Sequence, residues 1–151
     1  ADQKIAGYLE LEELDPVYRI TRLRFVQQEP MVLVTSYLPY QKCRKIVEED
    51  LSNRSLYAFL REECGITIAR GRRRIDAIVA NEMEAEHFQV DRGFPLLRME
   101  SVSYSADGDP VEYFIGLFRT DRASFVVDLV NVDPGQRQAG GSVDGEDFWL
   151  P

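Results

Sequence analysis

In the stretch VYRITRLRF, residues 17–25, apolar and polar residues alternate along residues 18–21 and, in the opposite phase, along residues 22–25, and this pattern predicts a β-strand. Successive side chains of a strand point to opposite faces. One face therefore carries four of these side chains: Tyr18, Ile20, Arg22 and Arg24. Both faces carry large apolar groups, and arginine is rarely buried unless it is paired. Arg22 and Arg24 therefore either reach water at a sheet margin or meet an anionic group.

The same pattern of helix and strand positions occurs twice in the chain. Residues 6–25 and 85–104 align without a gap at an offset of about 79 residues. Each copy continues through a polar turn and a proline into a second strand, and Asp107-Gly108 is a strong hairpin signal. We therefore predict two units, each a short helix followed by a β-hairpin.

The two units differ in charge. Ser101 and Ser103 occupy the positions in the second copy that Arg22 and Arg24 hold in the first. The scaffold matches while the charge does not, so a purely structural need for arginine would have to apply to only one hairpin.

Two helix-like segments and a strand are predicted between the units. Residues 41–49 carry an apolar stripe that consists of Cys43, Ile46 and Val47. Asn53 is placed to cap a second helix, which ends near Gly65. Residues 66–79 are strand-like. Asn81 and Glu84 then form a predicted N-cap pair for the helix of the second unit.

The two ends of the chain lead to further expectations. A long strand precedes the helix of the second unit, whereas the chain begins at the helix of the first. We therefore expect a leading strand in the full protein that this chain lacks. Residues 125–130 predict one more strand, which closes a domain at residues 1–130. Residues 131–151 are rich in glycine and acidic residues, and this composition predicts a flexible tail.

Composition narrows the class of protein. A chain of 151 residues is long enough for one domain with a real core. It carries 18 basic and 26 acidic residues, a net charge of −8, and such a chain binds nucleic acid poorly by itself because phosphate affinity comes from clustered Lys and Arg. No apolar run approaches the roughly 20 residues of a membrane span, and no signal peptide is visible. We expect a cytoplasmic protein without membrane contact.

Few residues favour metal or nucleophilic chemistry. Cys43 and Cys64 have neither metal-binding spacing nor the pattern of a disulfide framework, so we expect two reduced thiols. His87 is the sole histidine, and it lies on the polar side of a short predicted helix, where a surface position is expected. No catalytic residue, metal or cofactor is indicated.

Three stretches in this order resemble a known family: VYRITRLRFVQQEPMVLVTSYLP, SLYAFLREECGITI and PLLRMESVSYSADGDPVEYFIGLFRTDR. They are similar to the UTRA domain, the effector-binding domain of the HutC subfamily of GntR-type bacterial transcription regulators. The resemblance covers nearly all of residues 1–130. It implies an α+β fold like that of chorismate lyase, an antiparallel sheet of about six strands with helices packed on it. It also implies a homodimer and a preceding winged helix-turn-helix domain, absent from this chain, through which DNA is bound.

The resemblance also implies a binding site. In members that sense sugar phosphates, two strand arginines hold the effector phosphate, and a serine and a tyrosine at a helix start assist. The matching residues are Arg22, Arg24, Ser55 and Tyr57. Guanidinium groups bind phosphate or carboxylate oxygens in charge-assisted pairs, and a helix N-terminus adds backbone N–H donors. We therefore expect a small anionic effector that carries a phosphate or a carboxylate.

Two positions depart from the family pattern. Val34 stands where the family usually has a glutamate, and Phe118 stands where it usually has a tyrosine, whereas Glu112 is retained. Both departures remove groups that would hydrogen-bond a sugar hydroxyl. We therefore expect an effector that is smaller or flatter than an amino-sugar phosphate, such as a carboxylate with an apolar body.

Each of these residues also has a structural interpretation. Arg22 and Arg24 would then be edge arginines paired with acids, and Ser55 and Tyr57 would cap and pack their helix. Glu112 would pair with an arginine of the segment RTDR, residues 119–122, which we expect to form a turn held by ion pairs. The segment RGRRR, residues 70–74, is interpreted as a solvated strand edge and not as a nucleic-acid patch.

Two functions follow from the resemblance. The first is a ligand-gated regulator, in which the effector binds between the two hairpins. Binding then changes how the absent winged helix-turn-helix domain contacts DNA, and repression of transcription is relieved. The alternative is an enzyme like chorismate lyase, in which Arg22 and Arg24 bind a carboxylic acid and Glu112 serves as acid or base. The motif match is to regulators, so we expect the first.

Overall fold

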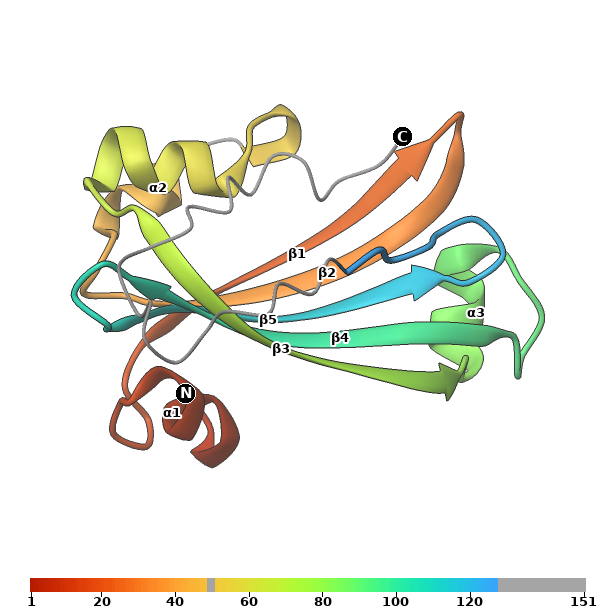
Figure 1. The fold of residues 1–151 in the computed structure, drawn as a ribbon, viewed down its shortest axis with the longest axis horizontal. Helices are drawn as coiled ribbons and strands as arrows, with labels where there is room; N and C mark the ends of the chain where they lie inside the picture. Colours follow the sequence, from red (N-terminus) through yellow and green to blue (C-terminus); the bar gives the residue numbers. More distant parts are fainter. Residues whose placement is uncertain (49–50, 128–151) are drawn as a thin grey trace, which may run out of the picture.

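A computed structural model describes residues 1–48 and 51–127 of the chain. The elements follow the order α1 (Gln3–Leu9), β1 (Val17–Val26), β2 (Glu29–Pro39), the 3₁₀ helices η1 (Arg44–Glu48) and η2 (Leu51–Asn53), α2 (Leu56–Cys64), β3 (Ile68–Val79), α3 (Glu82–Phe88), β4 (Pro95–Ser105) and β5 (Pro110–Arg119). Figure 1 shows these helices packed around one sheet, so the predicted α+β class is confirmed.

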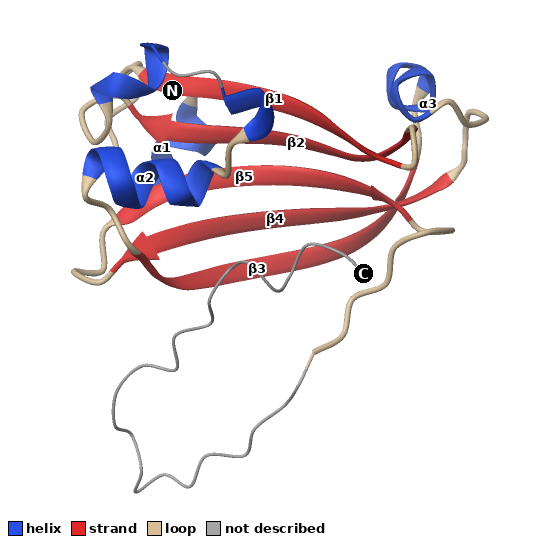
Figure 2. Ribbon diagram, turned by 90° about the horizontal axis from the view of Figure 1, so that it is seen from above, coloured by secondary structure: helices blue, strands red, loops and turns tan. Residues whose placement is uncertain are grey.

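The described strands form one antiparallel sheet in the order β1-β2-β5-β4-β3. The hairpins β1–β2 and β4–β5 each follow a short helix, and β2 pairs with β5 at the centre of the sheet (Figure 2). The expectation of about six strands is too high by one for the described residues, because residues 125–127 have no strand geometry. The rest of that predicted strand and the predicted tail lie outside the described residues.

Helices cover the two faces of the sheet differently. Strand register places Arg22, Val34 and Gly116 in one row across β1, β2 and β5, and we call the side of the sheet on which the side chains of Arg22 and Val34 lie the arginine face. α2 packs on one end of the arginine face through Leu56, Phe59 and Leu60, while α1 and α3 pack on the opposite face (Figures 1 and 2). The middle of the arginine face is therefore left without a helix above it.

The segment before α2 differs from its prediction in two respects. Residues 44–48 form the 3₁₀ helix η1 instead of an α-helix, and a repeat of three residues buries Cys43 and Ile46 while it turns Val47 out to 70% exposure. The N-cap of α2 is Ser55 and not Asn53: Ser55 Oγ accepts a hydrogen bond from Ala58 N at 3.4 Å. The helix thus begins two residues later than its predicted cap implied.

The cysteines also correct a prediction, because Cys43 and Cys64 are joined by a disulfide bond. Their Cα atoms lie 5.5 Å apart, within the range that a disulfide requires. The sequence separation of 21 residues matches no recognisable pattern. Proximity arises in three dimensions, where the residue before η1 meets the last residue of α2.

Other local predictions are confirmed. Asn81 Oδ1 accepts a hydrogen bond from Glu84 N, and Glu84 Oε2 accepts one from Asn81 N, both at 2.9 Å, so the predicted capping box starts α3. His87 is exposed, as expected for the polar side of that helix. Among the described helices, none is both long and apolar enough to cross a bilayer.

Candidate functional site

Arg22 is the central residue of the arginine face. It is half-buried, and its Nη1 atom is buried without a hydrogen-bond partner among the described residues. Burial lowers the pKa of Arg22, and the charge of neighbouring Arg24 lowers it further, while Glu112 and Tyr57 act in the opposite direction. Arg24 itself is exposed. A buried donor without an acceptor is rare in folded proteins, so Arg22 is the first candidate for contact with a ligand.

Glu112 brings a second unusual group to the same face. Its side chain is buried in β5, with 2% exposure, and Oε2 accepts a hydrogen bond from Tyr57 OH at 2.8 Å. Burial raises the pKa of this carboxyl, whereas the hydroxyls of Ser36, Tyr57 and Ser103 and the charge of Arg22 lower it. The cost of desolvating the charge is the largest of these effects.

Tyr57 connects α2 to the sheet. It follows the first residue of α2, and besides its bond to Glu112 its hydroxyl lies 3.0 Å from Ser103 Oγ on β4. Burial raises the pKa of Tyr57, and the charge of Glu112 raises it further, while Arg73 of β3 lowers it. Tyr57 therefore does more than pack its helix, because its hydroxyl bonds Glu112. Ser55, in contrast, is exposed and serves as the N-cap of α2.

Two serines that were not among the predicted site residues lie on the arginine face. Ser36 on β2 and Ser101 on β4 both pair in register with Phe114 of β5. They are 1% and 2% exposed, and neither Oγ atom has a well-aligned hydrogen-bond partner. The Ser36 hydroxyl lowers the pKa of Glu112, so it lies near that carboxyl although it has no hydrogen-bond partner. Register within the sheet reveals both residues, since serine in a strand carries no pattern of its own.

The two departures from the family pattern lie together in an apolar region. Val34 and Phe118 belong to one buried cluster, which we call the apolar end of the arginine face and which consists of Met31, Val32, Val34, Met99, Phe114 and Phe118. The phenyl ring of Phe125, from the segment after β5, meets the ring of Phe118 edge-on at 5.0 Å between centroids. The arginine face therefore has a polar part near Glu112 and an apolar part near Phe118.

Arg22 also lines a groove at the edge of the sheet. The groove has a volume of about 400 Å³ and runs between β1 and the 3₁₀ helices. Ile20 and Arg22 line it from the strand, and Leu51 lines it from η2. Arg22 thus borders this groove, and it lies near enough to Glu112 and Tyr57 for both to raise its pKa.

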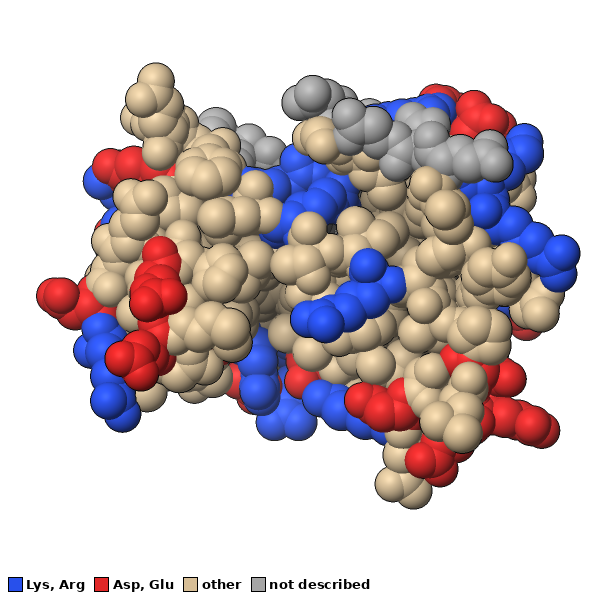
Figure 3. All heavy atoms as spheres, turned by 180° about the vertical axis from the view of Figure 1, so that it is seen from behind, with Lys and Arg blue, Asp and Glu red and all other residues tan. Residues whose placement is uncertain are grey.

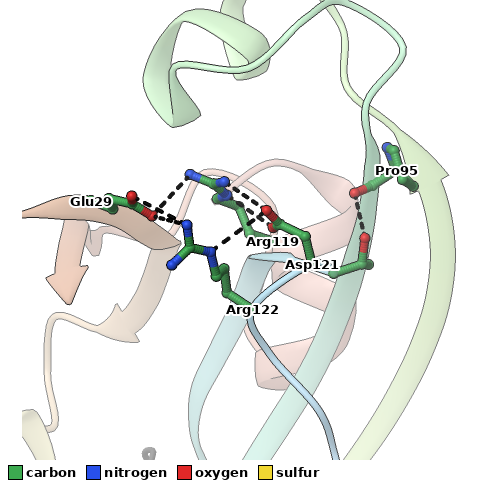
Figure 4. A network of polar contacts seen from close by, with 6 residues as sticks. Glu29, Pro95, Arg119, Asp121 and Arg122 are labelled. Atoms are coloured by element: carbon green, nitrogen blue, oxygen red, sulfur yellow. Dashed lines mark hydrogen bonds and ion pairs between the residues drawn. The ribbon is translucent and has the colours of Figure 1, made fainter. Parts of the chain in front are cut away.

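The segment RTDR forms the ion-paired turn that the sequence predicted (Figure 4). Arg119 Nη2 donates to Asp121 Oδ2 at 2.7 Å, and Arg122 Nη2 lies 3.1 Å from Glu29 Oε2. Thr120 Oγ1 donates to the carbonyl oxygen of Pro95 at 2.8 Å. The structural partner proposed for Glu112 in this segment is therefore wrong, because the two arginines pair with other carboxylates.

The arginines of residues 70–74 are exposed on the edge strand β3, as predicted for a solvated edge. The guanidinium of Arg70 stacks 3.8 Å from the ring centroid of Tyr104, and Arg74 pairs with Asp76 at 3.1 Å. On the face drawn in Figure 3, basic groups lie in separate patches among acidic and uncharged ones. Within residues 1–48 and 51–127, no group of three or more His, Cys, Asp or Glu side chains is arranged to hold a metal ion.

Comparison with known proteins identifies the family. The family model of the UTRA domain matches residues 1–124. The HTH-type transcriptional regulator GmuR of Bacillus subtilis is 31% identical over 130 residues, which cover 86% of this chain and 54% of the regulator. The chain thus spans about half the length of the curated relatives that it matches.

Solved structures agree with this match. A putative transcriptional regulator from Streptomyces coelicolor is 36% identical, with a TM-score of 0.76 over 83% of this chain and 82% of the other. The effector domain of PhnF from Mycobacterium smegmatis is 29% identical, with a TM-score of 0.81 over 87% of this chain and 80% of the other. In sequence and in fold, the chain belongs to the UTRA domain family.

Proposed function

We propose that this chain is the effector-sensing domain of a DNA-binding transcription regulator and that it binds a small anionic metabolite through Arg22. Membership of the UTRA family and the names of its relatives support the regulatory role. The observation that carries the choice of ligand is the Nη1 atom of Arg22, which is buried without an acceptor. A phosphate or carboxylate oxygen would supply that acceptor in a charge-assisted hydrogen bond.

The surroundings of Arg22 support an anion over a neutral ligand. Arg24 lies near enough for its charge to act on Arg22, so two positive charges repel each other until an anion binds. Burial raises the pKa of Glu112, so this carboxyl keeps its proton to a higher pH than an exposed glutamate does. The hydroxyls of Ser36 and Ser101, which also lack partners, are additional donors on the same face.

The link to DNA lies outside this chain in our proposal. The net charge of −8 on this chain disfavours direct contact with DNA phosphates. The operator is therefore bound by a winged helix-turn-helix domain elsewhere in the full protein. That protein is cytoplasmic and belongs to the HutC subfamily. The regulator acts as a homodimer and a repressor. The effector favours one arrangement of the dimer and thereby shifts its affinity for DNA, which requires a different affinity of the effector for the two arrangements.

A panel of anions tests this proposal. Thermal-shift measurements with inorganic phosphate, phosphate esters and aliphatic and aromatic acids should find ligands that raise the melting temperature of the chain. The tightest ligand is then incubated with the chain and recovered for mass spectrometry. An unchanged ligand is the result that we expect of a sensor, whereas a product formed in proportion to protein would contradict the proposal and favour an enzyme.

A further inference from the structure

The segment after β5 covers part of the arginine face. Two ion pairs of the RTDR turn hold its start, and Ala123 and Phe125 then pack against the apolar end. Phe125 is half-buried there, whereas the next residues, Val126 and Val127, are 74% and 65% exposed. Among the described residues after Ala123, Phe125 is therefore the side chain that packs against the sheet.

The ring of Phe118, which Phe125 contacts, lies over Gly116, a residue in the same row as Arg22. A Cβ atom built on Gly116 would lie 2.8 Å from Cε2 of Phe118, so the ring of Phe118 lies over Gly116. Gly116 pairs in register with Val34, and Val34 pairs with Arg22. The absence of a side chain at Gly116 thus allows Phe118 to form a wall beside the row that contains the buried guanidinium.

Phe125 holds that wall in place. The two rings lie at an interplanar angle of 87° with centroids 5.0 Å apart, an edge-to-face contact that aromatic pairs favour. Val32 and Val34 in the same cluster pack against the wall and carry no hydrogen-bonding group. A ligand hydroxyl placed at this end would lose its hydrogen bonds to water without replacement.

We infer that Phe125 is a specificity-determining residue, which holds Phe118 over Gly116 and so restricts the site to compact anions. This inference rests on the proposed function, since it concerns the same site. Phe125 acts by positioning Phe118, and its removal leaves Arg22 and Glu112 unchanged. Removal of the Phe125 ring should therefore change which sizes of anion the site accepts, while the site still requires an anion.

Two series of anions of increasing size test this inference by isothermal titration. The first consists of inorganic phosphate, glycerol 3-phosphate and glucose 6-phosphate, and the second of acetate, hexanoate and phenylacetate. The unaltered chain should bind a small member of one series and discriminate against the largest. Phe125→Ala should improve the affinity for the largest member, relative to the smallest, by about tenfold or more, a difference typical of pocket shape. Val126→Ala, an exposed neighbour, is the matched control and should leave the ratio unchanged.

A second variant, Phe125→Leu, keeps an apolar side chain and decides the question if Phe125→Ala does not fold, as judged by circular dichroism. An unchanged ratio of affinities in either folded variant overturns the inference while the proposed function stands. If the unaltered chain binds no member of either series, the proposed function fails, and this inference fails with it. The two failures are therefore distinguishable.

Discussion

Arg22 is half-buried and has a guanidinium nitrogen without a partner, which predicts an unusual effect of Arg22→Met on stability. Leaving a buried polar group unsatisfied costs about 1–3 kcal/mol, and the lower part of this range applies because the residue is only half-buried. Methionine keeps much of the apolar stem of arginine. We therefore expect the free energy of unfolding to rise by about 1 kcal/mol, or the melting temperature by about 2–4 °C for a chain of this size.

The measurement is equilibrium unfolding in urea, in buffers free of phosphate and sulfate, because a bound anion would stabilise the native state and obscure the comparison. Arg119→Met is the matched control, since Arg119 makes two hydrogen bonds to Asp121, at 3.1 and 2.7 Å. That variant should lose about 1 kcal/mol or more. A loss of more than about 1 kcal/mol in Arg22→Met would mean that Arg22 has a structural role, and it would refute the reasoning.

Three further predictions concern other parts of the fold. Burial raises the pKa of Glu112 above its ordinary value of 4.5, so the native state holds this proton at a higher pH than the unfolded state does. The stability that this group contributes is therefore present at low pH and is lost as pH rises through the raised pKa. Urea unfolding of Glu112→Gln across this pH range should lack that loss. Parallel plots of unfolding free energy against pH for the variant and the unaltered chain would contradict the raised pKa of Glu112. Reduction of the Cys43–Cys64 bond, which spans 21 residues, should lower the free energy of unfolding by about 3 kcal/mol; equal unfolding midpoints with and without a thiol reductant would show that the bond is not formed in solution. Gly116→Ala should cost about 1–3 kcal/mol by overpacking against Phe118, and a variant with unchanged thermal stability would show that the ring does not lie over Gly116.

Much of the fold could be predicted from local pattern, because strand alternation and capping are local properties. The alternation in residues 17–25 correctly indicated β1, and Asn81 with Glu84 correctly indicated the start of α3. The failures have non-local or competing causes. The disulfide depends on the packing of η1 against α2, and the exposure of Val47 follows from a 3₁₀ turn whose residues suit an α-helix equally well.

The candidate site could be predicted only in part. Alternation placed Arg22 on a definite face of β1, and the family resemblance named Tyr57 and Glu112, which the structure brings into contact with each other. Ser36 was missed, and Ser101 was noted only as the counterpart of Arg22, because their place in the site depends on the register of β2, β5 and β4, which one strand does not reveal. Arg73 looked like one member of a solvated run, and its charge reaches Tyr57 only because β3 folds beside β4.

Isothermal titration of Arg22→Met tests the central claim most directly. The tightest anion of the panel is titrated into the unaltered chain, into Arg22→Met and into Arg92→Met, which removes an exposed arginine from the turn between α3 and β4. We predict one binding site per chain, a loss of affinity of at least about 30-fold in Arg22→Met, as for truncation of a buried charged partner, and no change in Arg92→Met. Equal affinity of Arg22→Met and the unaltered chain would contradict the claim that Arg22 binds the effector.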